Sequence, residues 1–471
     1  MALAGRRGLV LESVLVGVVL TAQALLFARG LPTAADYDEG VYLAAVDAFR
    51  HGQQLGADIF TAQPPGFYLL LASGDALFGD TRDAVRAWVI GFALIGCLAA
   101  YLLGRAVGGP AAGLGAAALL AVAPPYPTFA ARISADLPAY VLGLLALTCL
   151  AYAGERRRVL LFGLAGALFA ASVSVKLSAL TLIVPLIGLG VVRRASVREA
   201  ATAVTGAAGV AIAVLAASGG ALQDLWFGAV TYHRRAREVP GPGVEANAER
   251  VLDFLDPRTP FGWLVPLALL ALLLIRPRLR LPLWPLWLWA AVTALLLVWH
   301  QPLHDNHLVL LAVVLAVPAG IVLGATVREL DGARALVAAS GLALALAAGY
   351  AQESRRLERN QSAEPAGVER AAREVKARTN PDQLVVTDRP IIAFIADRRV
   401  PGEVLDSAAL AFDAGVIDAA KIMKAIDRHR VPVVAAAREF NKEPEVLAGL
   451  AERFSGRARI DGVTIYFGPH R

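Results

Sequence analysis

The chain alternates between long apolar stretches and short polar turns as far as Tyr350. A helix needs roughly 20 apolar residues to cross a ~30 Å hydrocarbon core. About eleven stretches approach that length, and they lie near Leu9 to Phe27, Ala84 to Val107, Ala111 to Pro125, Leu137 to Tyr152, Val159 to Val175, Leu177 to Val192, Ala200 to Ala217, Phe261 to Ile275, Leu281 to Trp299, Leu308 to Gly324, and Ala335 to Tyr350. We therefore predict a mainly α-helical polytopic membrane protein with about 11 transmembrane helices, the first of them uncleaved.

The charged residues support this class and suggest an orientation. The 471 residues are 57% hydrophobic and 18% charged, whereas a soluble protein carries about 25% charged residues. If the N-terminus is cytoplasmic, every cytoplasmic turn is basic, as the positive-inside rule requires; these turns contain Arg105, Arg156 to Arg158, Arg193, Arg194, Arg198, Arg276, Arg278, Arg280, Arg328 and Arg334. We expect a multi-pass protein of the plasma (inner) membrane, and the net charge of +6 is assigned to helix orientation and not to nucleic-acid binding.

The pattern changes after Tyr350. Residues 351–380 are charged and are predicted to form a linker, and residues 381–471 are predicted to form a small soluble α/β domain. Short β-branched runs predict strands at Leu384 to Thr387, Val431 to Ala435 and Val463 to Phe467, and helical periodicity predicts helices at Ala414 to His429 and Pro444 to Phe454. Because the number of spans is odd, we expect this domain outside the cytoplasm, on the side of the first outer loop 29–83. Residues 1–350 form the predicted membrane domain.

The first outer loop gathers carboxylates beside the membrane. Asp36, Asp38 and Glu39 lie at the start of a stretch that has the pattern of an amphipathic helix ending near Gly52. One interpretation is that Asp38 caps this helix and Glu39 complements its dipole. The other is a functional site, because acids at a bilayer boundary are usually hydrated or occupied by a ligand. The run from Gln63 to Tyr68, Gln-Pro-Pro-Gly-Phe-Tyr, then fixes a turn before a second apolar stretch.

Three motifs make a family resemblance specific: Asp38-Glu39-Gly40-Val41-Tyr42, Gln63-Pro64-Pro65-Gly66-Phe67-Tyr68, and Arg132-Ile133-Ser134-Ala135-Asp136-Leu137-Pro138. Together they resemble the membrane glycosyltransferases of the GT-C fold. The similarity is greatest to the branch that contains the protein O-mannosyltransferases and the aminoarabinose transferase of lipid A. Such proteins take a sugar from a polyprenyl phosphate and transfer it to an acceptor on the outer face.

The resemblance assigns roles to residues of this sequence. Asp38 matches the acid that serves as general base or orients the acceptor, Glu39 its partner, and Asp136 the second acidic position. Gln63 stands where many relatives have Lys or His before the Pro-Pro pair, so it is a candidate for binding the donor phosphate without a positive charge. Asp36, Tyr42 and Tyr68 accompany these motifs and are expected to bind the acceptor.

Lys176 and two neighbouring clusters are candidates for binding the donor. Lys176 lies alone between two spans; it either reaches to the interface as a lone lysine does or, as its match in the family implies, contacts phosphate. Arg132 is a further phosphate candidate, although its spacing also allows it to pair with Asp136 across one helical turn. His304 and His307 surround Asp305 in the turn that follows Trp299. These histidines are hydrated loop residues, metal ligands, or, as the resemblance implies, phosphate or sugar contacts.

The leading hypothesis is an inverting transferase that uses a polyprenyl-phosphate sugar, with a glycan, lipid or protein as acceptor and membrane lipids around it. The alternative is a secondary transporter or lipid flippase, in which the same charges form a translocation path. Transporters usually show repeated halves and ionisable groups at mid-membrane, and neither feature is visible in this sequence. No cofactor or metal site is assigned, and a divalent cation stays open because the fold contains both metal-bearing and metal-free members.

Overall fold

The computed structural model describes residues 2–239 and 243–468. These residues form two compact units, and neither follows the chain continuously. The helical unit contains residues 2–31, 86–212 and 243–360, and the mixed unit contains residues 32–85, 213–239 and 361–468. The mixed unit therefore combines the first outer loop, a second loop and the whole described C-terminal segment.

Every predicted apolar stretch lies on a helix of the structure. These helices are α1 (Ala2–Ala28), α4 (Arg82–Gly108), α5 (Pro110–Ala121), α7 (Asp136–Ala151), α8 (Arg158–Val175), η2 (Leu177–Leu182) continued by α9 (Ile183–Val192), α10 (Val197–Ser218), α14 (Pro260–Leu274), α15 (Trp284–Trp299), α16 (Leu308–Glu329) and α17 (Gly332–Arg359). Within the described ranges, six helices are long and apolar enough to cross a membrane, and five shorter apolar helices accompany them. The chain is thus a multi-pass integral membrane protein, as the sequence predicts.

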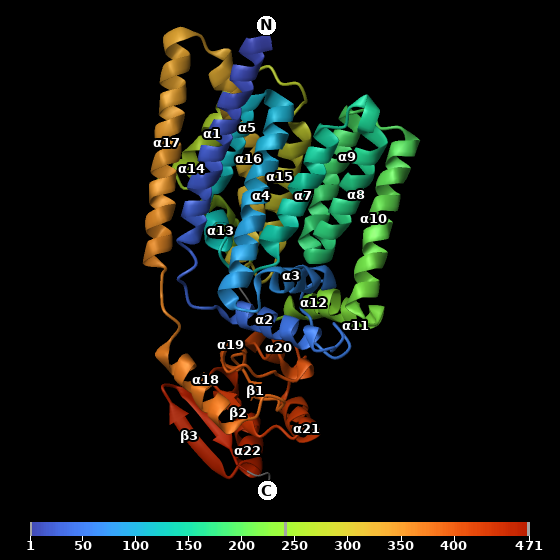
Figure 1. Cartoon of the computed structure of the whole chain (residues 1–471), viewed down its shortest axis with the longest axis vertical. Helices are drawn as coiled ribbons and strands as arrows, with labels where there is room; N and C mark the ends of the chain where they lie inside the picture. The colour runs from blue at the N-terminus through green and yellow to red at the C-terminus, as the bar shows by residue number, and fades with distance from the viewer. Residues whose placement is uncertain (1, 240–242, 469–471) are drawn as a thin grey trace. The chain divides into compact units, whose positions relative to one another are not determined.

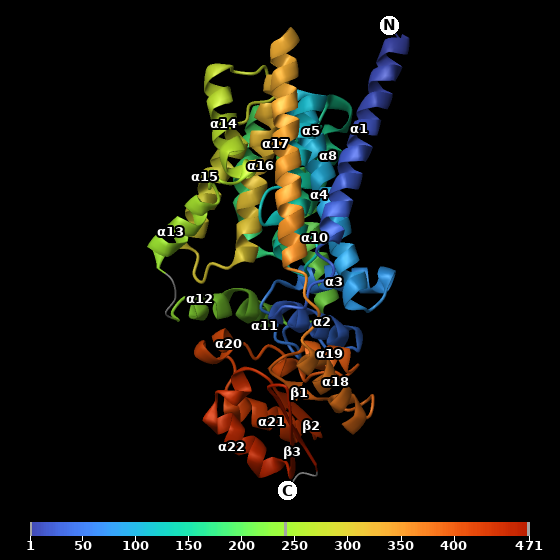
Figure 2. The same cartoon turned by 90° about the vertical axis from the view of Figure 1, so that its left-hand side faces the viewer.

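The core of the helical unit is the pair α5 and α16, which lie side by side in both views (Figures 1 and 2). Glycines allow this contact, because a Cβ on Gly115 would lie 2.4 Å from the carbonyl oxygen of Gly320. A Cβ on Gly324 would lie 2.1 Å from the carbonyl oxygen of Ala111. Small residues let helix backbones approach in membranes, where lipid supplies no hydrophobic force between helices. Shorter helices of this unit are α6 (Tyr126–Phe129), η1 (Glu155–Arg157), α13 (Val244–Asp253) and η4 (Asp305–His307).

The mixed unit contains the predicted α/β domain. Its four-stranded sheet has the order β1-β2-β4-β3, with β1 (Val386–Thr387) parallel to β2 (Val433–Ala436) and antiparallel pairs between β2 and β4 (Val463–Phe467) and between β4 and β3 (Gly456–Ile460). The helices of the C-terminal segment are α18 (Ala366–Arg378), α19 (Ile391–Ile395), η5 (Gly402–Val404), α20 (Ala409–Asp413), α21 (Ala419–His429), η6 (Glu439–Asn441) and α22 (Pro444–Arg453). The predicted strands and the two predicted helices are present, with shifts of a few residues at their ends.

Helix α18 lies in the stretch predicted to be a linker. Val368, Ala371, Ala372 and Val375 recur at helical spacing and are buried, so they form an apolar stripe that packs on the sheet. Helix α18 lies beside β2 and β3 (Figure 1). Residues 361–380 thus contribute a helix to the mixed unit.

The loops in the mixed unit form short helices around the first outer loop. They are α2 (Tyr37–Arg50), α3 (Pro65–Phe78), α11 (Leu222–Trp226), the π-helix η3 (Phe227–Thr231) and α12 (Tyr232–Ala236). The second loop packs closely on the first, because a Cβ on Gly228 would lie 2.0 Å from the carbonyl oxygen of Thr61. The imidazole Nε2 of His233 also lies 2.7 Å from the carbonyl oxygen of Ala62.

Candidate active site

The residues predicted to carry the chemistry divide between the two units. The helical unit holds Asp136, Lys176, His304, His307 and Arg132, and the mixed unit holds Asp36, Asp38, Glu39, Tyr42, Gln63 and Tyr68.

Asp136 is the first residue of α7 and is fully buried. A carboxylate at this position is stabilised by the helix dipole. Its Oδ2 lies 3.2 Å from Lys176 Nζ and accepts a hydrogen bond of 2.9 Å from the side-chain amide of Asn306. Its Oδ1 is buried and has no hydrogen-bond partner among the described residues. The two donors therefore share one carboxylate oxygen, and no described residue donates a hydrogen bond to the other.

Lys176 lies where α8 ends. Its backbone is extended, with φ −151° and ψ 126°, between the last turn of α8 and the first residue of η2. This break turns the chain back and places the ammonium group beside Asp136, so the lysine is not a lone snorkelling residue: it is 8% exposed and paired. Burying an ion pair is costly unless further polar groups complete it, and Asn306 supplies such a group.

The predicted histidine turn is held by α13. Arg250 donates to Asp305 Oδ1 at 2.5 Å and to the carbonyl oxygen of Leu303. Asn247, almost fully buried, donates to the carbonyl oxygen of His300 at 2.7 Å. The turn therefore has a defined shape although it is polar.

His304 and His307 pack together in this turn. The backbone N–H of His304 donates to His307 Nδ1 at 3.2 Å, and the two ring centroids are 5.7 Å apart. Partial burial, and then the positive charges of Arg250 and Lys176, lower the pKa of His304. In the described parts of the chain, no group of three or more His, Cys, Asp or Glu residues is arranged to hold a metal ion. The lowered pKa of His304 favours its neutral ring at pH 7, where the ring can donate or accept a hydrogen bond.

Arg132 does not take the place beside Asp136 that its spacing allows. Because α7 begins at Asp136, Arg132 precedes the helix and does not share a helical face with the acid. Its guanidinium carbon lies 6.0 Å from the ring centroid of Phe129. Asn306, in contrast, contacts Asp136 directly, although no motif in the sequence predicts it as a site residue.

In the mixed unit, a capping box begins α2. Asp36 Oδ1 accepts from the backbone N–H of Glu39 at 2.9 Å, and Glu39 Oε2 accepts from the backbone N–H of Asp36 at 3.3 Å. The capping residue is thus Asp36, and the interpretation that Asp38 caps the helix is wrong. Asp38 is exposed in the first turn of the helix, so its carboxylate is not needed to cap the helix backbone.

Tyr42, Gln63 and Tyr68 lie together in this unit. Gln63 Nε2 donates to Tyr42 Oη at 3.4 Å, and the ring centroids of Tyr42 and Tyr68 are 6.2 Å apart. Burial, and then the charge of Asp406, raise the pKa of Tyr68, so its hydroxyl stays protonated. Phe67 joins the cluster, with its ring centroid 4.8 Å from that of Tyr42. The two motifs of the first outer loop are therefore adjacent in space.

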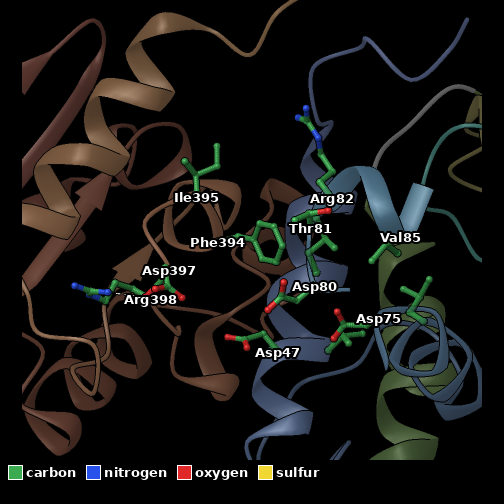
Figure 3. A pocket seen from close by; sticks show the side chains of 13 residues that line it. Asp47, Asp75, Asp80, Thr81, Arg82, Val85, Phe394, Ile395, Asp397 and Arg398 are labelled. Atoms are coloured by element: carbon green, nitrogen blue, oxygen red, sulfur yellow. Dashed lines mark hydrogen bonds between the residues drawn. The ribbon is translucent and has the colours of Figure 1, made fainter. Parts of the chain in front are cut away.

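A cavity of about 280 Å³ opens elsewhere in the mixed unit. Figure 3 shows Asp47, Asp75 and Asp80 on its loop side and Asp397 and Arg398 on the side of the C-terminal segment. Two of its acids have cationic partners, Arg50 for Asp75 at 2.5 Å and Lys376 for Asp397 at 3.8 Å. The imidazole Nδ1 of His51 lies 3.2 Å from Asp47 Oδ1. The cavity contains none of the predicted site residues, and we assign it no part of the chemistry.

Comparison with known proteins tests the fold. Residues 62–218 match the family model described as dolichyl-phosphate-mannose-protein mannosyltransferase. The structure of ArnT from Cupriavidus metallidurans bound to undecaprenyl phosphate superposes with a TM-score of 0.71 at 16% identity, covering 97% of this chain and 99% of that one. The chain has the GT-C fold. The resemblance predicted from the three motifs is therefore confirmed.

A second GT-C structure is more distant. The archaeal oligosaccharyltransferase AglB from Archaeoglobus fulgidus, in complex with an inhibitory peptide and a dolichol-phosphate, gives a TM-score of 0.57 at 13% identity. The match covers 97% of this chain and 74% of that one. No curated protein sequence matches the chain significantly. At these sequence identities the comparisons show the GT-C fold alone. The reaction must be inferred from the residues of the site.

Proposed function

We propose that this GT-C protein transfers a sugar from a polyprenyl-phosphate donor to a glycan, lipid or protein acceptor, with inversion at the anomeric carbon. The match to a mannosyltransferase family model supports a sugar as the transferred group. The ArnT structure contains undecaprenyl phosphate and the AglB structure contains a dolichol-phosphate, which supports a lipid phosphate as carrier. The reaction would take place outside the cytoplasm, given basic turns on the opposite side.

The observation that carries this proposal is the exposed carboxylate of Asp38 beside a completed helix cap. Asp36 and Glu39 satisfy the start of α2 between them. Capping of the helix therefore does not require the carboxylate of Asp38. Asp38 matches the acid that serves as general base or orients the acceptor in the GT-C proteins that this sequence resembles. A carboxylate must be within hydrogen-bond reach of an acceptor hydroxyl to take its proton, and the exposure of Asp38 leaves its side chain accessible to such a hydroxyl.

The proposed reaction is a single displacement. The acceptor oxygen attacks the anomeric carbon, the bond from that carbon to the phosphate oxygen breaks, and its electron pair leaves with the polyprenyl phosphate. Asp38 takes the proton from the acceptor hydroxyl. The leaving phosphate gains charge, and positive or hydrogen-bonding groups stabilise it; Lys176, His304 and His307 are the proposed donors, with Arg132 and Gln63 as further polar contacts.

The remaining site residues would orient the substrates. Asp136 offers its unpaired Oδ1 to a sugar or acceptor hydroxyl, and Glu39 stabilises the turn that carries Asp38. Tyr42 and Tyr68 are proposed to shape the acceptor side of this turn, and Asp36 supports it through the oxygen that caps α2. No step in this scheme is routed through a metal ion.

The experiment that tests the proposal is release of polyprenyl phosphate by purified protein from a panel of polyprenyl-phosphate sugars, with membrane lipid extracts as acceptors. Release together with sugar transfer to an acceptor supports the proposal and identifies the donor. Movement of labelled lipid across the bilayer of proteoliposomes, without release of polyprenyl phosphate from any donor, would contradict the proposal and favour the flippase alternative.

A further inference from the structure

The residue before Asp38 is held by the C-terminal segment of the same unit. The hydroxyl of Tyr37 donates to Asp406 Oδ1 at 3.0 Å, and the guanidinium carbon of Arg438 lies 4.7 Å from the centroid of the Tyr37 ring. Burial, followed by the charge of Asp406, raises the pKa of Tyr37 well above its ordinary value. The hydroxyl therefore remains a donor over the whole working range of pH.

The partners of Tyr37 are themselves fixed. Asp388 is fully buried, and its carboxylate accepts from the backbone N–H groups of Ala437, Arg438 and Phe440 at 2.7, 2.7 and 2.8 Å. These three bonds hold the loop after β2 that carries Arg438. Asp406 is 8% exposed, and its Oδ1 also accepts from the backbone N–H of Ala408 at 3.3 Å. A buried, hydrogen-bonded carboxylate of this kind is a rigid support.

The contacts continue on both sides of Asp38. Two residues after it, a Cβ on Gly40 would lie 2.7 Å from the backbone nitrogen of Ile391, so only glycine allows α2 and α19 to pack so closely. Three residues before it, the backbone N–H of Ala35 donates to Glu364 Oε2 at 2.9 Å. Glu364 also binds Arg82 at 3.1 Å and Arg389 at 3.5 Å. The turn that carries Asp38 is thus fastened to the C-terminal segment at several points.

From these contacts we propose that the C-terminal segment positions Asp38, with Asp406 as a positioning residue that acts through Tyr37. The inference rests on the role proposed above for Asp38. The first turn of a helix is where the chain frays most easily, and a displacement of about 1 Å of a reacting group can cost about 100-fold in rate. Fixing the Tyr37 ring and hydroxyl limits such displacement, while Asp38 itself stays exposed.

The test compares variants of the hydrogen bond in the full-length protein. Asp406→Ala and Tyr37→Phe remove the acceptor and the donor, and each should lower kcat for phosphate release by about 10- to 100-fold, with KM for the donor changed little. Asp406→Asn keeps an acceptor oxygen and should recover most of the activity. Because Tyr37 and Asp406 act as one unit, the double variant Tyr37→Phe, Asp406→Ala should be no slower than either single one.

Ser407→Ala is the matched control for loss of a buried hydrogen bond in the same loop. The hydroxyl of Ser407, fully buried next to Asp406, donates to the carbonyl oxygen of Val404 at 2.8 Å. This variant should lower Tm and leave kcat unchanged. Hydrogen–deuterium exchange should become faster at the start of α2 in Asp406→Ala and stay unchanged there in Ser407→Ala.

Three results would overturn the inference: wild-type kcat in Asp406→Ala, an equal loss of kcat in Ser407→Ala, or unchanged exchange at the start of α2 in Asp406→Ala. The first two results can be measured only if the wild-type protein releases polyprenyl phosphate from a donor. If the wild-type protein releases phosphate from no donor, the proposed function fails, and the exchange measurement alone then decides whether the C-terminal segment orders the Asp38 turn.

Discussion

Lys176 Nζ lies 3.2 Å from Asp136 Oδ2, and both side chains are buried in the helical unit. The pair joins the end of α8 to the beginning of α7, which are separated in the sequence by the whole of both helices. Asn306 donates to the same oxygen from the histidine turn. The Asp136 carboxylate, predicted to be catalytic, therefore connects α7 to two parts of the chain that carry predicted donor-binding residues, the end of α8 and the histidine turn.

Removing Lys176 should destabilise the protein strongly. Lys176→Ala leaves the buried carboxyl group of Asp136 without its cationic partner, and losing one partner of a buried ion pair costs about 3–5 kcal/mol. The double variant Lys176→Met, Asp136→Asn contains no buried charge at this position, so it should recover most of the Tm while it stays inactive in phosphate release. The measurement is thermal unfolding in detergent, followed by activity per folded molecule. Equal activity of the double variant and the wild type would exclude a role for the pair in donor binding.

Asn306 should contribute more to stability and to donor binding than Asp305, its neighbour in the turn. Asn306→Leu removes a hydrogen bond to a charged, buried group, which should cost about 1.5–3 kcal/mol, and it should also raise the KM for the donor because the Asp136 carboxylate loses one of its supports. Asp305→Asn is the matched control, because the Asp305 side chain is 75% exposed and an exposed ion pair contributes about 0–1 kcal/mol. Thermal unfolding and donor titration of both variants measure these effects. Similar losses of stability and donor affinity in the two variants would contradict the prediction.

His304 should make stability depend on pH near neutrality. Partial burial and the charges of Arg250 and Lys176 lower the pKa of His304 in the folded protein, so the folded state favours the neutral ring. Its contribution is complete above the ordinary pKa of about 6.5 and is lost as pH falls from there to the lowered folded pKa. Tm measured from pH 7.5 to pH 5 should therefore fall more for the wild type than for His304→Gln. A steeper fall of Tm in His304→Gln than in the wild type would contradict this prediction.

The helix cap should be separable from the chemistry. Asp36→Ala removes the side chain that accepts from Glu39 N–H and should cost about 0.5–2 kcal/mol of stability. Asp36→Asn keeps a good capping oxygen and should leave Tm and activity close to those of the wild type. The expected order of Tm is wild type, Asp36→Asn, then Asp36→Ala. Loss of activity in Asp36→Asn at unchanged Tm would show that this carboxylate takes part in the reaction.

The sequence predicts the elements better than their contacts. Apolar length and period determine helices whatever their neighbours are, and each predicted span lies on a helix. Strand β3 escapes prediction although its residues alternate in burial on an edge strand, because Gly456 and Ala458 have low β-propensity. The true cap, Asp36, is not evident from the sequence because three acids in four positions offer several possible starts, and the backbone decides among them.

The site shows the same limit. A motif identifies Asp136 and an isolated charge identifies Lys176, but their pairing links residues on different helices and has no local signal. Asn306 lies 170 residues from Asp136 in the sequence, inside a turn whose histidines are the conspicuous residues. The link from Tyr37 to Asp406 spans 369 residues and depends on the C-terminal segment joining the unit of the first outer loop. Such contacts follow from tertiary packing, which no periodicity encodes.

The role of Asp38 as general base is tested by comparing Asp38→Asn with Asp36→Asn in release of polyprenyl phosphate from the donor that the wild-type protein uses. Each variant replaces one carboxylate of the same turn by an amide, so the two variants differ only in which carboxylate is lost. We predict that Asp38→Asn loses at least about 100-fold in rate, as expected for a missing general base, while Tm and donor affinity stay near wild type and Asp36→Asn remains active. Wild-type turnover in a folded Asp38→Asn protein would contradict this role.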